Sequence, residues 1–527
     1  MGYALAALSG LLLALSFPKY GHPAFAWIAL APLLVALSDD SSTPLPAVRS
    51  GSRSRASSLS RAFGMGLVTG GIYFTGTLYW IARVMVMYGG LQIWVALLVN
   101  VALIAYLALF PGAFAVILRY VVQVAGVEAL LAAPLIWVTT ELGRTYLLTG
   151  FPWVLLGYSQ TRVLPIAQLA SLIGVFGLSM LVAAVNSALA IAVVGRFRPR
   201  WVAPAAAVAI VLLVAVWGRQ RMARGELTRE GEAVSVGLVQ GNVDQGEKWD
   251  AVRAGTIFRE YLGLTERAVH SGAQMVLWPE SSTPFYFEED PGSADQVRAL
   301  ARRAKVPILL GSDQIEHASP RKYYNAAFLV EADGSTGGVY RKMHLVPFGE
   351  YVPLKRLLFF ISPLVEAVSD FSAGEQVTLV PVGSHRLSVA ICYEIVYPAL
   401  VRDFVADGSE MLTTITNDAW FGRTSAPYQH FEQASMRAIE EGRYLVRSAN
   451  TGISGIVDPY GRILAESAIF ERTVVVGQAR FLSSTTFYAR HGDILAYAAA
   501  VATVALLAVA WRTRRTMNRY RVVAIDN

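Results

Sequence analysis

The spacing of the apolar segments constrains this chain more than any other feature. A bilayer core requires about 20 mainly apolar residues per helix. Two short apolar segments, 3–17 and 24–37, open the chain, and a long polar block precedes the last apolar segment. The longer segments are 64–89, 91–118, 128–147, 165–195, 201–217 and 493–511. We therefore predict an α-helical membrane bundle of about eight transmembrane helices, together with an extramembrane domain.

The first short segment has a second interpretation, as a signal peptide. No Lys or Arg precedes its apolar run, and no clean small-x-small cleavage site follows it. Segments 3–17 and 24–37 also fit a hairpin of two short helices. Whether both segments fully span the membrane stays open from the sequence.

The composition agrees with a membrane location. Charged residues make up 16% of the 527 residues, against about 25% in an ordinary soluble protein, and the mean hydropathy is +0.45. The net charge of +7 raises the question of nucleic-acid binding, but the basic residues lie mainly at the edges of apolar segments. We interpret them as topology signals and expect no nucleic-acid partner.

Clusters of arginine predict the orientation of the spans. With an even number of spans, the loop after the second span, the loop after the sixth and the carboxyl-terminal tail lie on one side, which the positive-inside rule assigns to the cytoplasm. The arginines are Arg49, Arg53, Arg55, Arg61, Arg196, Arg198, Arg200, Arg512, Arg514, Arg515, Arg519 and Arg521. Arg219, Arg221 and Arg224 argue against this orientation, but long translocated domains are largely exempt from the rule. Both termini are then cytoplasmic, and the polar block lies on the far side of the membrane.

Within the polar block, short β-like runs alternate with amphipathic helical stretches. Typical examples are the strand 234–240, the helix 258–269 and the strand 411–416, and a helix is expected over 431–446 before a strand at 455–458. This alternation is typical of a layered α/β domain. The predicted division is a membrane domain at 1–218, an α/β domain at 232–481, a final transmembrane helix at 490–512 and a tail at 513–527.

Three polar residues follow predicted strands of this domain. Glu280 follows the strand at 275–278, Lys342 follows Arg341 at the end of another strand, and Cys392 ends the run that begins at Leu387. Cys392 is the only cysteine, so it forms no intramolecular disulfide. Each residue alone has an ordinary structural explanation, because a lone cysteine is usually packed and charged residues are usually solvated. Together they supply a nucleophile, a base and a cation at the ends of strands.

In this order and within their local motifs, Glu280, Lys342 and Cys392 resemble the Glu-Lys-Cys triad of the nitrilase superfamily. That resemblance implies an αββα sandwich. Within the superfamily the chain resembles the apolipoprotein N-acyltransferase family over nearly its whole length. The matching stretches are residues 239–242, 248–250, 278–280, 324–325, 340–342, 347–350, 392–394 and 417–422, with 150–153 in the membrane part.

The family resemblance implies acyl transfer in two steps through a thioester. Glu280 takes the thiol proton, and Cys392 attacks an ester carbonyl of a membrane phospholipid. Lys342 and backbone N–H groups stabilise the oxyanion. The acyl chain then passes to the α-amine of the diacylglyceryl-cysteine at the amino terminus of an apolipoprotein, the last step of lipoprotein maturation. The implied location is the bacterial inner membrane, with the catalytic domain on the periplasmic side.

Other residues are expected to support the site. Glu350 and Glu394 are candidates to orient Lys342 or hold a polar network, while Tyr393 and Asn325 are candidates to hydrogen-bond near the carbonyl. The aromatic residues considered for lipid contact are Trp249, Trp420 and Trp153, although aromatic residues are more often simply packed and the loop 149–153 is typical of an interfacial anchor. We expect His344 to be structural. We expect no cofactor and no metal, because no Cys/His cluster has metal-ligand spacing.

Other functions remain as alternatives. A membrane-anchored nitrilase-type amidase would use the same triad with water as acceptor. A binding scaffold with an inactive nitrilase-like domain would tolerate loss of Cys392 or Glu280. A transporter would require charged residues in the middle of its spans, and the spans offer few. We expect a monomer; the preferred phospholipid, and the loops that admit substrate, are not readable from the sequence.

Overall fold

The computed structural model describes most of the chain, in segments that form two compact units. The first unit comprises Met1–Tyr79, Leu97–Arg221 and Asp493–Asn527, and the second comprises Trp80–Ala96 and Met222–Gly492. The described residues are 1–38, 52–88, 90, 92–195, 199–248, 250–347, 349–351 and 371–523. The residues Arg49, Arg196, Arg198, Trp249 and Phe348, which the sequence analysis used, lie outside these ranges.

The first unit is built from helices. Among the described residues, four helices are long and apolar enough to cross a membrane: Ile93–Ala125, Ala170–Val194, Val202–Thr228 and Ile494–Met517. The helices are α1 (Gly2–Ala14), α2 (Ala26–Ala29), α3 (Ala31–Ser38), α4 (Ser52–Leu78), α6 (Ile93–Ala125), α7 (Ala133–Tyr146), α8 (Leu164–Ala167), α9 (Ala170–Val194), α10 (Val202–Arg224) and α17 (Ile494–Val523). Within the unit, α1 packs on α4, and α7 packs on α9 and α17.

The predicted count of eight spans is not reached in the described helices. The segment 128–147 contains α7, whose 14 residues span about 21 Å, less than the about 30 Å of a bilayer core. A 3₁₀ turn precedes α7, and beyond its end Leu148 has a φ of 52°. The segment 64–89 divides at Tyr79 into α4 and α5 (Trp80–Met87). Segments 3–17 and 24–37 form only short helices.

The loop after α7 is tied to that helix by buried side chains. Arg144 donates hydrogen bonds from Nη1 to the carbonyls of Phe151 and Trp153, at 3.2 and 2.7 Å. Glu141 accepts a bond from the Leu156 N–H at 2.7 Å. Neither side chain is exposed, so both organise the loop from inside the unit.

The second unit contains two six-stranded sheets. Their orders are β12-β1-β2-β3-β4-β5 and β11-β10-β9-β8-β7-β6. In each, three strands at the centre run parallel, β1–β3 and β7–β9, and the outer strands pair antiparallel. The strands are β1 (Ala233–Gln240), β2 (Met275–Leu277), β3 (Ile308–Glu316), β4 (Lys322–Val330), β5 (Thr336–Arg341), β6 (Val380–Val382), β7 (His385–Ile391), β8 (Met411–Thr416), β9 (Leu445–Ala449), β10 (Gly455–Val457), β11 (Ile463–Glu466) and β12 (Thr473–Arg480).

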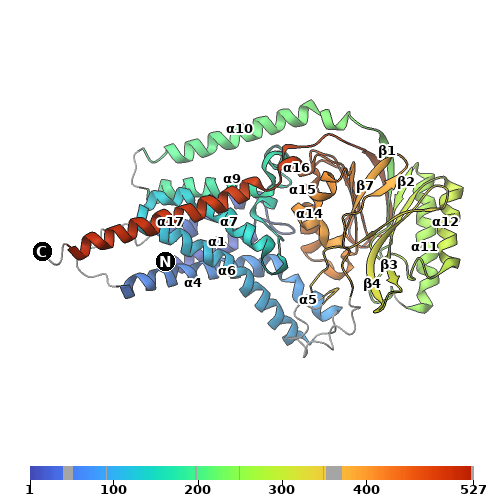
Figure 1. Ribbon diagram of the computed structural model, residues 1–527, viewed down its shortest axis with the longest axis horizontal. Coiled ribbons are helices and arrows are strands. Elements are labelled where there is room, and N and C mark those ends of the chain that lie inside the picture. The colour runs from blue at the N-terminus through green and yellow to red at the C-terminus, as the bar shows by residue number, and fades with distance from the viewer. Residues whose placement is uncertain are drawn as a thin grey trace. The chain divides into compact units, whose positions relative to one another are not determined.

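Helices cover the outer face of each sheet. Figure 1 shows α11 (Ala251–His270) and α12 (Pro291–Ala304) beside the β1–β4 sheet, and α14 (Pro398–Ala406) and α15 (Ala426–Glu441) beside the other. The buried residues Ile257, Tyr261, Leu264 and Ala268 repeat at helical spacing along α11 and join the core against β1 and β2. The sheets contact each other through β1 and β9. The layers are therefore α, β, β and α.

Most strands and helices predicted for the polar block are present. The strand predicted at 411–416 is β8, and the strand predicted at 234–240 is β1 with one more residue at its start. The helix predicted over 431–446 was wrong at its carboxyl end. Gly442, with a φ of 65°, ends α15, and the apolar residues that follow form β9. Those residues belong to a strand that is buried on both faces, so their run has no period that separates strand from helix.

Candidate active site

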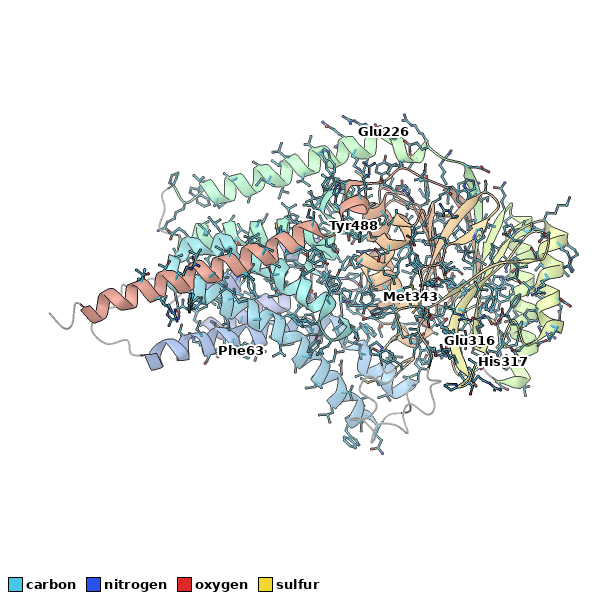
Figure 2. All side chains as sticks on the ribbon, in the orientation of Figure 1. Phe63, Glu226, Glu316, His317, Met343 and Tyr488 are labelled. Carbon is cyan, nitrogen blue, oxygen red and sulfur yellow. The ribbon has the colours of Figure 1, made fainter. Side chains whose placement is uncertain are left out.

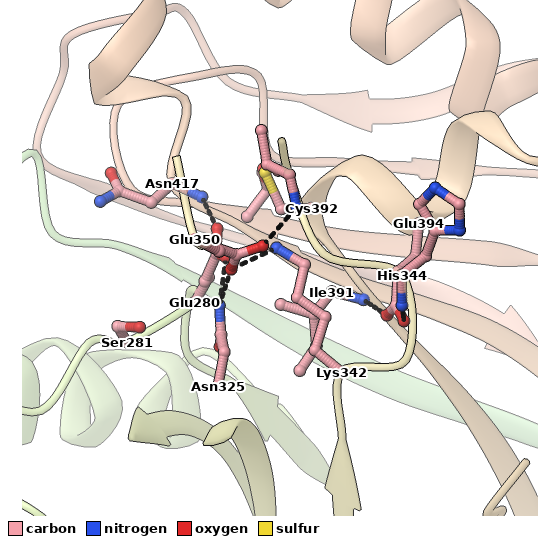
Figure 3. Close-up of polar contacts among 12 residues, drawn as sticks. Glu280, Ser281, Asn325, Lys342, His344, Glu350, Ile391, Cys392, Glu394 and Asn417 are labelled. Carbon is pink, nitrogen blue, oxygen red and sulfur yellow. Dashed lines mark hydrogen bonds and ion pairs between the residues drawn. The ribbon is translucent and has the colours of Figure 1, made fainter. Parts of the chain in front are cut away.

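Four strand ends meet at the candidate site. Glu280 follows β2, Lys342 follows β5, Cys392 follows β7 and Asn417 follows β8. Figure 3 shows their polar groups converging, with the Cys392 sulfur beside the carboxylates and the Lys342 ammonium. Met343, labelled in Figure 2, directly follows Lys342 in the chain. The carboxyl ends of parallel strands are where α/β proteins gather functional groups.

The Glu280 carboxylate is buried and accepts three hydrogen bonds. Its Oε1 receives Asn325 Nδ2 at 2.8 Å and Lys342 Nζ at 3.3 Å, and its Oε2 receives the Asn417 N–H at 2.8 Å. Burial alone would raise the pKa of Glu280. Lys342, together with these hydrogen bonds and the nearby Lys248, outweighs burial and holds the pKa below its usual range. Glu280 is therefore ionised and can accept a proton.

Close backbone packing places the Glu280 loop. A Cβ at position 311 would lie 2.4 Å from the Pro279 carbonyl oxygen and 2.7 Å from the Glu280 Cα. Only glycine at position 311 of β3 leaves room for this approach. Ser281, the next residue of the loop, has a φ of 41° and donates its hydroxyl to Asp313 at 2.8 Å.

Lys342 is 1% exposed and lies between two carboxylates. Its Nζ is 2.8 Å from Glu350 Oε1 and 3.3 Å from Glu280 Oε1. Asn325 bridges the same two oxygens, because its Nδ2 also donates to Glu350 at 2.9 Å. Burial opposes the ammonium form, but Glu350 and Glu280 outweigh it and raise the pKa of Lys342. The cation is therefore permanent.

Cys392 is at the sharp turn between β7 and the 3₁₀ turn η8 (Cys392–Val396), with a φ of 54°. This left-handed conformation is strained for a residue with a side chain, and such strain is common at functional sites. Burial and then the Glu280 carboxylate raise the pKa of the thiol, while Lys342 acts in the opposite direction without cancelling them. The resting thiol is therefore neutral, beside a carboxylate that can receive its proton.

Glu394 ties the Cys392 turn to the end of β5. Its Oε2 accepts the Ile391 N–H at 2.7 Å, and its Oε1 accepts the Met343 and His344 N–H groups at 2.7 and 3.0 Å. The Tyr340 hydroxyl donates to the same Oε1 at 2.8 Å. Burial raises the pKa of Glu394 to about 7. Its contacts thus fix the backbone around Cys392 and Lys342.

The other expected residues occupy different surroundings. Tyr393 is buried and packs edge-on against Tyr397, with ring centroids 5.2 Å apart. Trp420 packs edge-on against Tyr88 at 5.3 Å. Trp153 belongs to the first unit, where it is buried, and Trp249 is outside the described residues.

His344 makes no hydrogen bond to the triad through its ring in the described contacts and instead packs on Tyr397 in a tilted arrangement, with centroids 3.8 Å apart. Burial, with the Lys342 ammonium, lowers the pKa of His344 to about 4. The imidazole is therefore neutral and poorly basic.

Sequence reasoning missed a buried cluster behind the nucleophile. Asp418, His430 and Arg447 are fully buried and bonded to one another, and His430 also reaches the Cys392 carbonyl. The stretch 417–422 is one of the motifs in the sequence, and Asp418 lies within it. His430 and Arg447 are on α15 and β9, where the sequence carries no mark of their proximity. Across the described ranges, no group of three His, Cys, Asp or Glu side chains is arranged to hold a metal ion.

Comparisons with known proteins place the chain in a family. The apolipoprotein N-acyltransferase N-terminal domain matches residues 9–188, and the carbon-nitrogen hydrolase family matches residues 235–484. An apolipoprotein N-acyltransferase from Geobacter metallireducens is 40% identical over 97% of this chain and 96% of its own length. One from Methylococcus capsulatus is 35% identical over 79% of this chain and 81% of its own length.

Among solved structures, Saccharomyces cerevisiae Nit3, a member of branch 10 of the nitrilase superfamily, covers 47% of this chain and 90% of its own length. Its identity is 20% and its TM-score is 0.38, so the assignment rests on the sequence relatives. These relatives match the membrane part and the α/β part together and in the same order. The chain therefore belongs to the apolipoprotein N-acyltransferase family.

Proposed function

We propose that the protein transfers an acyl chain from a membrane phospholipid to the α-amine of the diacylglyceryl-cysteine at the amino terminus of an apolipoprotein, by a ping-pong mechanism. Family membership over nearly the whole chain supports the overall reaction. The observation that carries the mechanism is the position of the Cys392 sulfur beside a buried Glu280 carboxylate that is bonded to Lys342.

In the first step, Cys392 Sγ forms a bond to the ester carbonyl carbon as the thiol proton moves to Glu280. Negative charge moves from the Glu280 carboxylate to the carbonyl oxygen. Because Lys342 lies against Glu280, it can stabilise the charge at either position. When the tetrahedral intermediate collapses, the C–O bond breaks and Glu280 returns its proton to the leaving alkoxide. A lysophospholipid departs, and the acyl chain remains as a thioester on Cys392.

In the second step, the α-amine of the acceptor attacks the thioester carbonyl. Glu280 takes a proton from the amine as the C–N bond forms. The C–S bond then breaks, and the thiolate recovers the proton from Glu280. The products are an amide on the apolipoprotein and the original thiol. Glu350 accepts a hydrogen bond from Lys342, and Asn325 donates to both Glu280 and Glu350, so these two residues hold Lys342 and Glu280 in place during both steps.

The membrane part follows from the chemistry of the substrates. Both substrates are anchored by acyl chains, at about 0.8 kcal/mol per buried methylene. Extracting either one into water is therefore prohibitive, and an active site at the bilayer surface avoids that cost. We propose a membrane domain at 1–218, a catalytic domain at 232–481, a final helix at 490–512 and a tail at 513–527. The apolar segments add to eight spans if the short ones also cross. The catalytic domain is then periplasmic, both termini are cytoplasmic, and the enzyme acts as a monomer.

Acyl-enzyme trapping tests the proposal. The purified full-length protein is incubated with phospholipid carrying a labelled acyl chain, and its intact mass is measured before and after hydroxylamine. The expected result is one acyl adduct that hydroxylamine removes, absent from the Cys392→Ala variant. The label should then move to a diacylglyceryl-cysteine peptide as an amide. Failure of the wild type to acquire the adduct would refute acyl transfer from lipid. Rapid release of free fatty acid without transfer would favour the amidase-like alternative, with water as acceptor.

A further inference from the structure

A buried cluster of three charged or titratable side chains lies behind the nucleophile. His430, on α15, has Nε2 3.1 Å from the carbonyl oxygen of Cys392. Arg447, on β9, has Nη2 2.9 Å from Asp418 Oδ2 and 3.0 Å from His430 Nδ1. All three side chains are 0% exposed. Because removing charges from water is expensive, such a group is expected to be retained for a specific purpose.

The contact with the Cys392 carbonyl determines the role of His430 Nε2. The Cys392 carbonyl can only accept, so Nε2 carries a hydrogen and donates it. Nδ1 lies between the Arg447 Nη2 donor at 3.0 Å and the Asp418 Oδ1 acceptor at 3.1 Å. Burial and then the Arg447 guanidinium lower the pKa of His430, and Asp418 acts in the opposite direction without cancelling them. Burial opposes ionisation of Asp418, but Arg447 and His430 outweigh it and lower its pKa to about 2. The cluster is thus a fixed set of donors and acceptors.

The Cys392 carbonyl belongs to the same peptide unit as the Tyr393 N–H. A trans peptide is planar, and its C=O and N–H point in opposite directions. The bond from His430 therefore fixes the orientation of the Tyr393 N–H, which points away from α15. It also polarises the peptide, which strengthens that N–H as a donor. The strained φ of Cys392 makes such support necessary, because this turn has no intrinsic preference for its conformation.

We propose that His430, held by Asp418 and Arg447, is a positioning residue that orients the Cys392–Tyr393 peptide so that the Tyr393 N–H stabilises the oxyanion together with Lys342. This rests on the proposed acyl-transfer function. In this role His430 acts through the Cys392 carbonyl and exchanges no proton. Its effect is confined to steps that pass through a tetrahedral oxyanion.

The same cluster links the nucleophile to the base. Asp418 follows Asn417, whose N–H binds Glu280 at 2.8 Å, and Thr416 donates its hydroxyl to Asp418 Oδ1 at 2.9 Å. Gly452 leaves room for this arrangement, since a Cβ there would lie 2.1 Å from Asp418 Oδ2. Because Thr416 and Arg447 hold Asp418 without His430, a displacement of His430 should move the Cys392 peptide while Asn417 and Glu280 keep their places.

Two amide variants separate the two ends of the His430 ring. The amide nitrogen of His430→Gln can occupy the position of Nε2 and donate to Cys392. The shorter His430→Asn places its amide near Nδ1, against Asp418, and does not reach the carbonyl. We expect the Gln variant to form the acyl-enzyme from phospholipid within about threefold of the wild-type rate and the Asn variant to be slower by about 100-fold.

Alkylation of Cys392 by iodoacetamide separates loss of oxyanion stabilisation from a general structural defect, because only a general defect would slow alkylation. This displacement needs the thiolate but forms no oxyanion. We expect both variants to be alkylated at close to the wild-type rate and with the same pH profile, whereas Glu280→Gln should slow alkylation and acylation together. Arg447→Lys, which keeps the charge but has a shorter side chain and loses the Nε donor to the Ile453 carbonyl, should show the same selective loss in a milder form and serves if His430→Asn does not fold.

The outcomes distinguish the two proposals. If the wild type forms the acyl adduct but the Gln and Asn variants are equally fast or equally slow, the positioning role of His430 is wrong. It is also wrong if alkylation falls in parallel with acylation. If the wild type forms no adduct from phospholipid, the proposed function fails and this inference fails with it.

Discussion

Replacing Lys342 with methionine tests the electrostatics of the site directly. The Lys342 ammonium is 2.8 Å from Glu350 and 3.3 Å from Glu280. At an effective dielectric constant near 20, these separations correspond to attractions of about 6 and about 5 kcal/mol. The cost of burying the ammonium offsets much of that sum. In Lys342→Met the two carboxylates, which share the Asn325 amide, lose the cation between them.

In Lys342→Met, the Glu280 and Glu350 carboxylates reduce their mutual repulsion when one of them binds a proton. Holding a glutamate with an ordinary pKa near 4.5 in its protonated form at pH 7 costs about 3 kcal/mol. We therefore expect Lys342→Met to lower the free energy of unfolding by about 3–5 kcal/mol at pH 7. Lower pH should reduce this deficit. The folded variant has a raised pKa and binds the proton more tightly than the unfolded chain, so its stability rises as the pH falls from 7 toward 4.5.

The double variant Lys342→Met/Glu350→Gln separates stability from catalysis. Removing the Glu350 charge leaves one carboxylate, Glu280, with the Asn325 amide and the Asn417 N–H. We expect the double variant to recover about 2–3 kcal/mol of the lost stability while remaining inactive in acyl-enzyme formation, because the cation is still missing. Denaturant unfolding of the detergent-solubilised protein measures the first quantity and intact mass the second. Equal stability of the single and double variants would refute the charge-balance explanation.

Three further results are expected. Glu394→Gln places an amide N–H₂ against backbone N–H donors, so it should lower the free energy of unfolding by about 2–3 kcal/mol and slow acyl-enzyme formation; unchanged stability in denaturant would contradict this. His344→Phe should keep the ring packing on Tyr397 but remove a group whose pKa is lowered to about 4. In the wild type, the free energy of unfolding should fall by up to about 3 kcal/mol between pH 6.5 and pH 4, because the imidazole is protonated in the unfolded chain before it is protonated in the folded protein. An equal fall in the variant would contradict this explanation. Gly311→Ala should displace the Glu280 loop and reduce acylation at least about tenfold, whereas the control Gly263→Ala, which has open space around it, should be as active as the wild type and slightly more stable; equal activities would show that Gly311 is not needed.

The local sequence indicates the ends of strands better than it indicates bends in the membrane part. Glu280, Lys342 and Cys392 each follow a short apolar strand, and that pattern depends only on neighbouring residues. Hydrophobic runs show that a segment is buried or lipid-facing, but not where it bends. Gly174, inside a long apolar segment, has a φ of 66°, and the break at Tyr79 separates α4 from α5 without any charged residue to mark it.

Contacts between distant segments were out of reach. His430 and Arg447 lie behind Cys392 because α15 and β9 pack beside β7 and β8, and one sequence carries no record of that packing. Asn325 was expected to act near a substrate carbonyl, yet its amide bridges Glu280 and Glu350. Its role depends on the pairing of β4 with β5, which brings it next to Lys342.

The helix α5 has a consequence for how the catalytic unit can be divided. Trp80 on α5 packs edge-on against Phe421, with ring centroids 4.9 Å apart, and Phe421 is in the turn that begins at Asp418. This helix clusters with residues 222–492, although more than a hundred residues separate it from them along the chain. A fragment cut at the boundaries of the hydrolase match, 235–484, would therefore expose the apolar faces of Phe421 and Trp420. The catalytic unit is discontinuous in sequence, because α5 precedes the rest of it by more than a hundred residues. A recombinant soluble version would therefore need α5 as a separate peptide or joined by circular permutation.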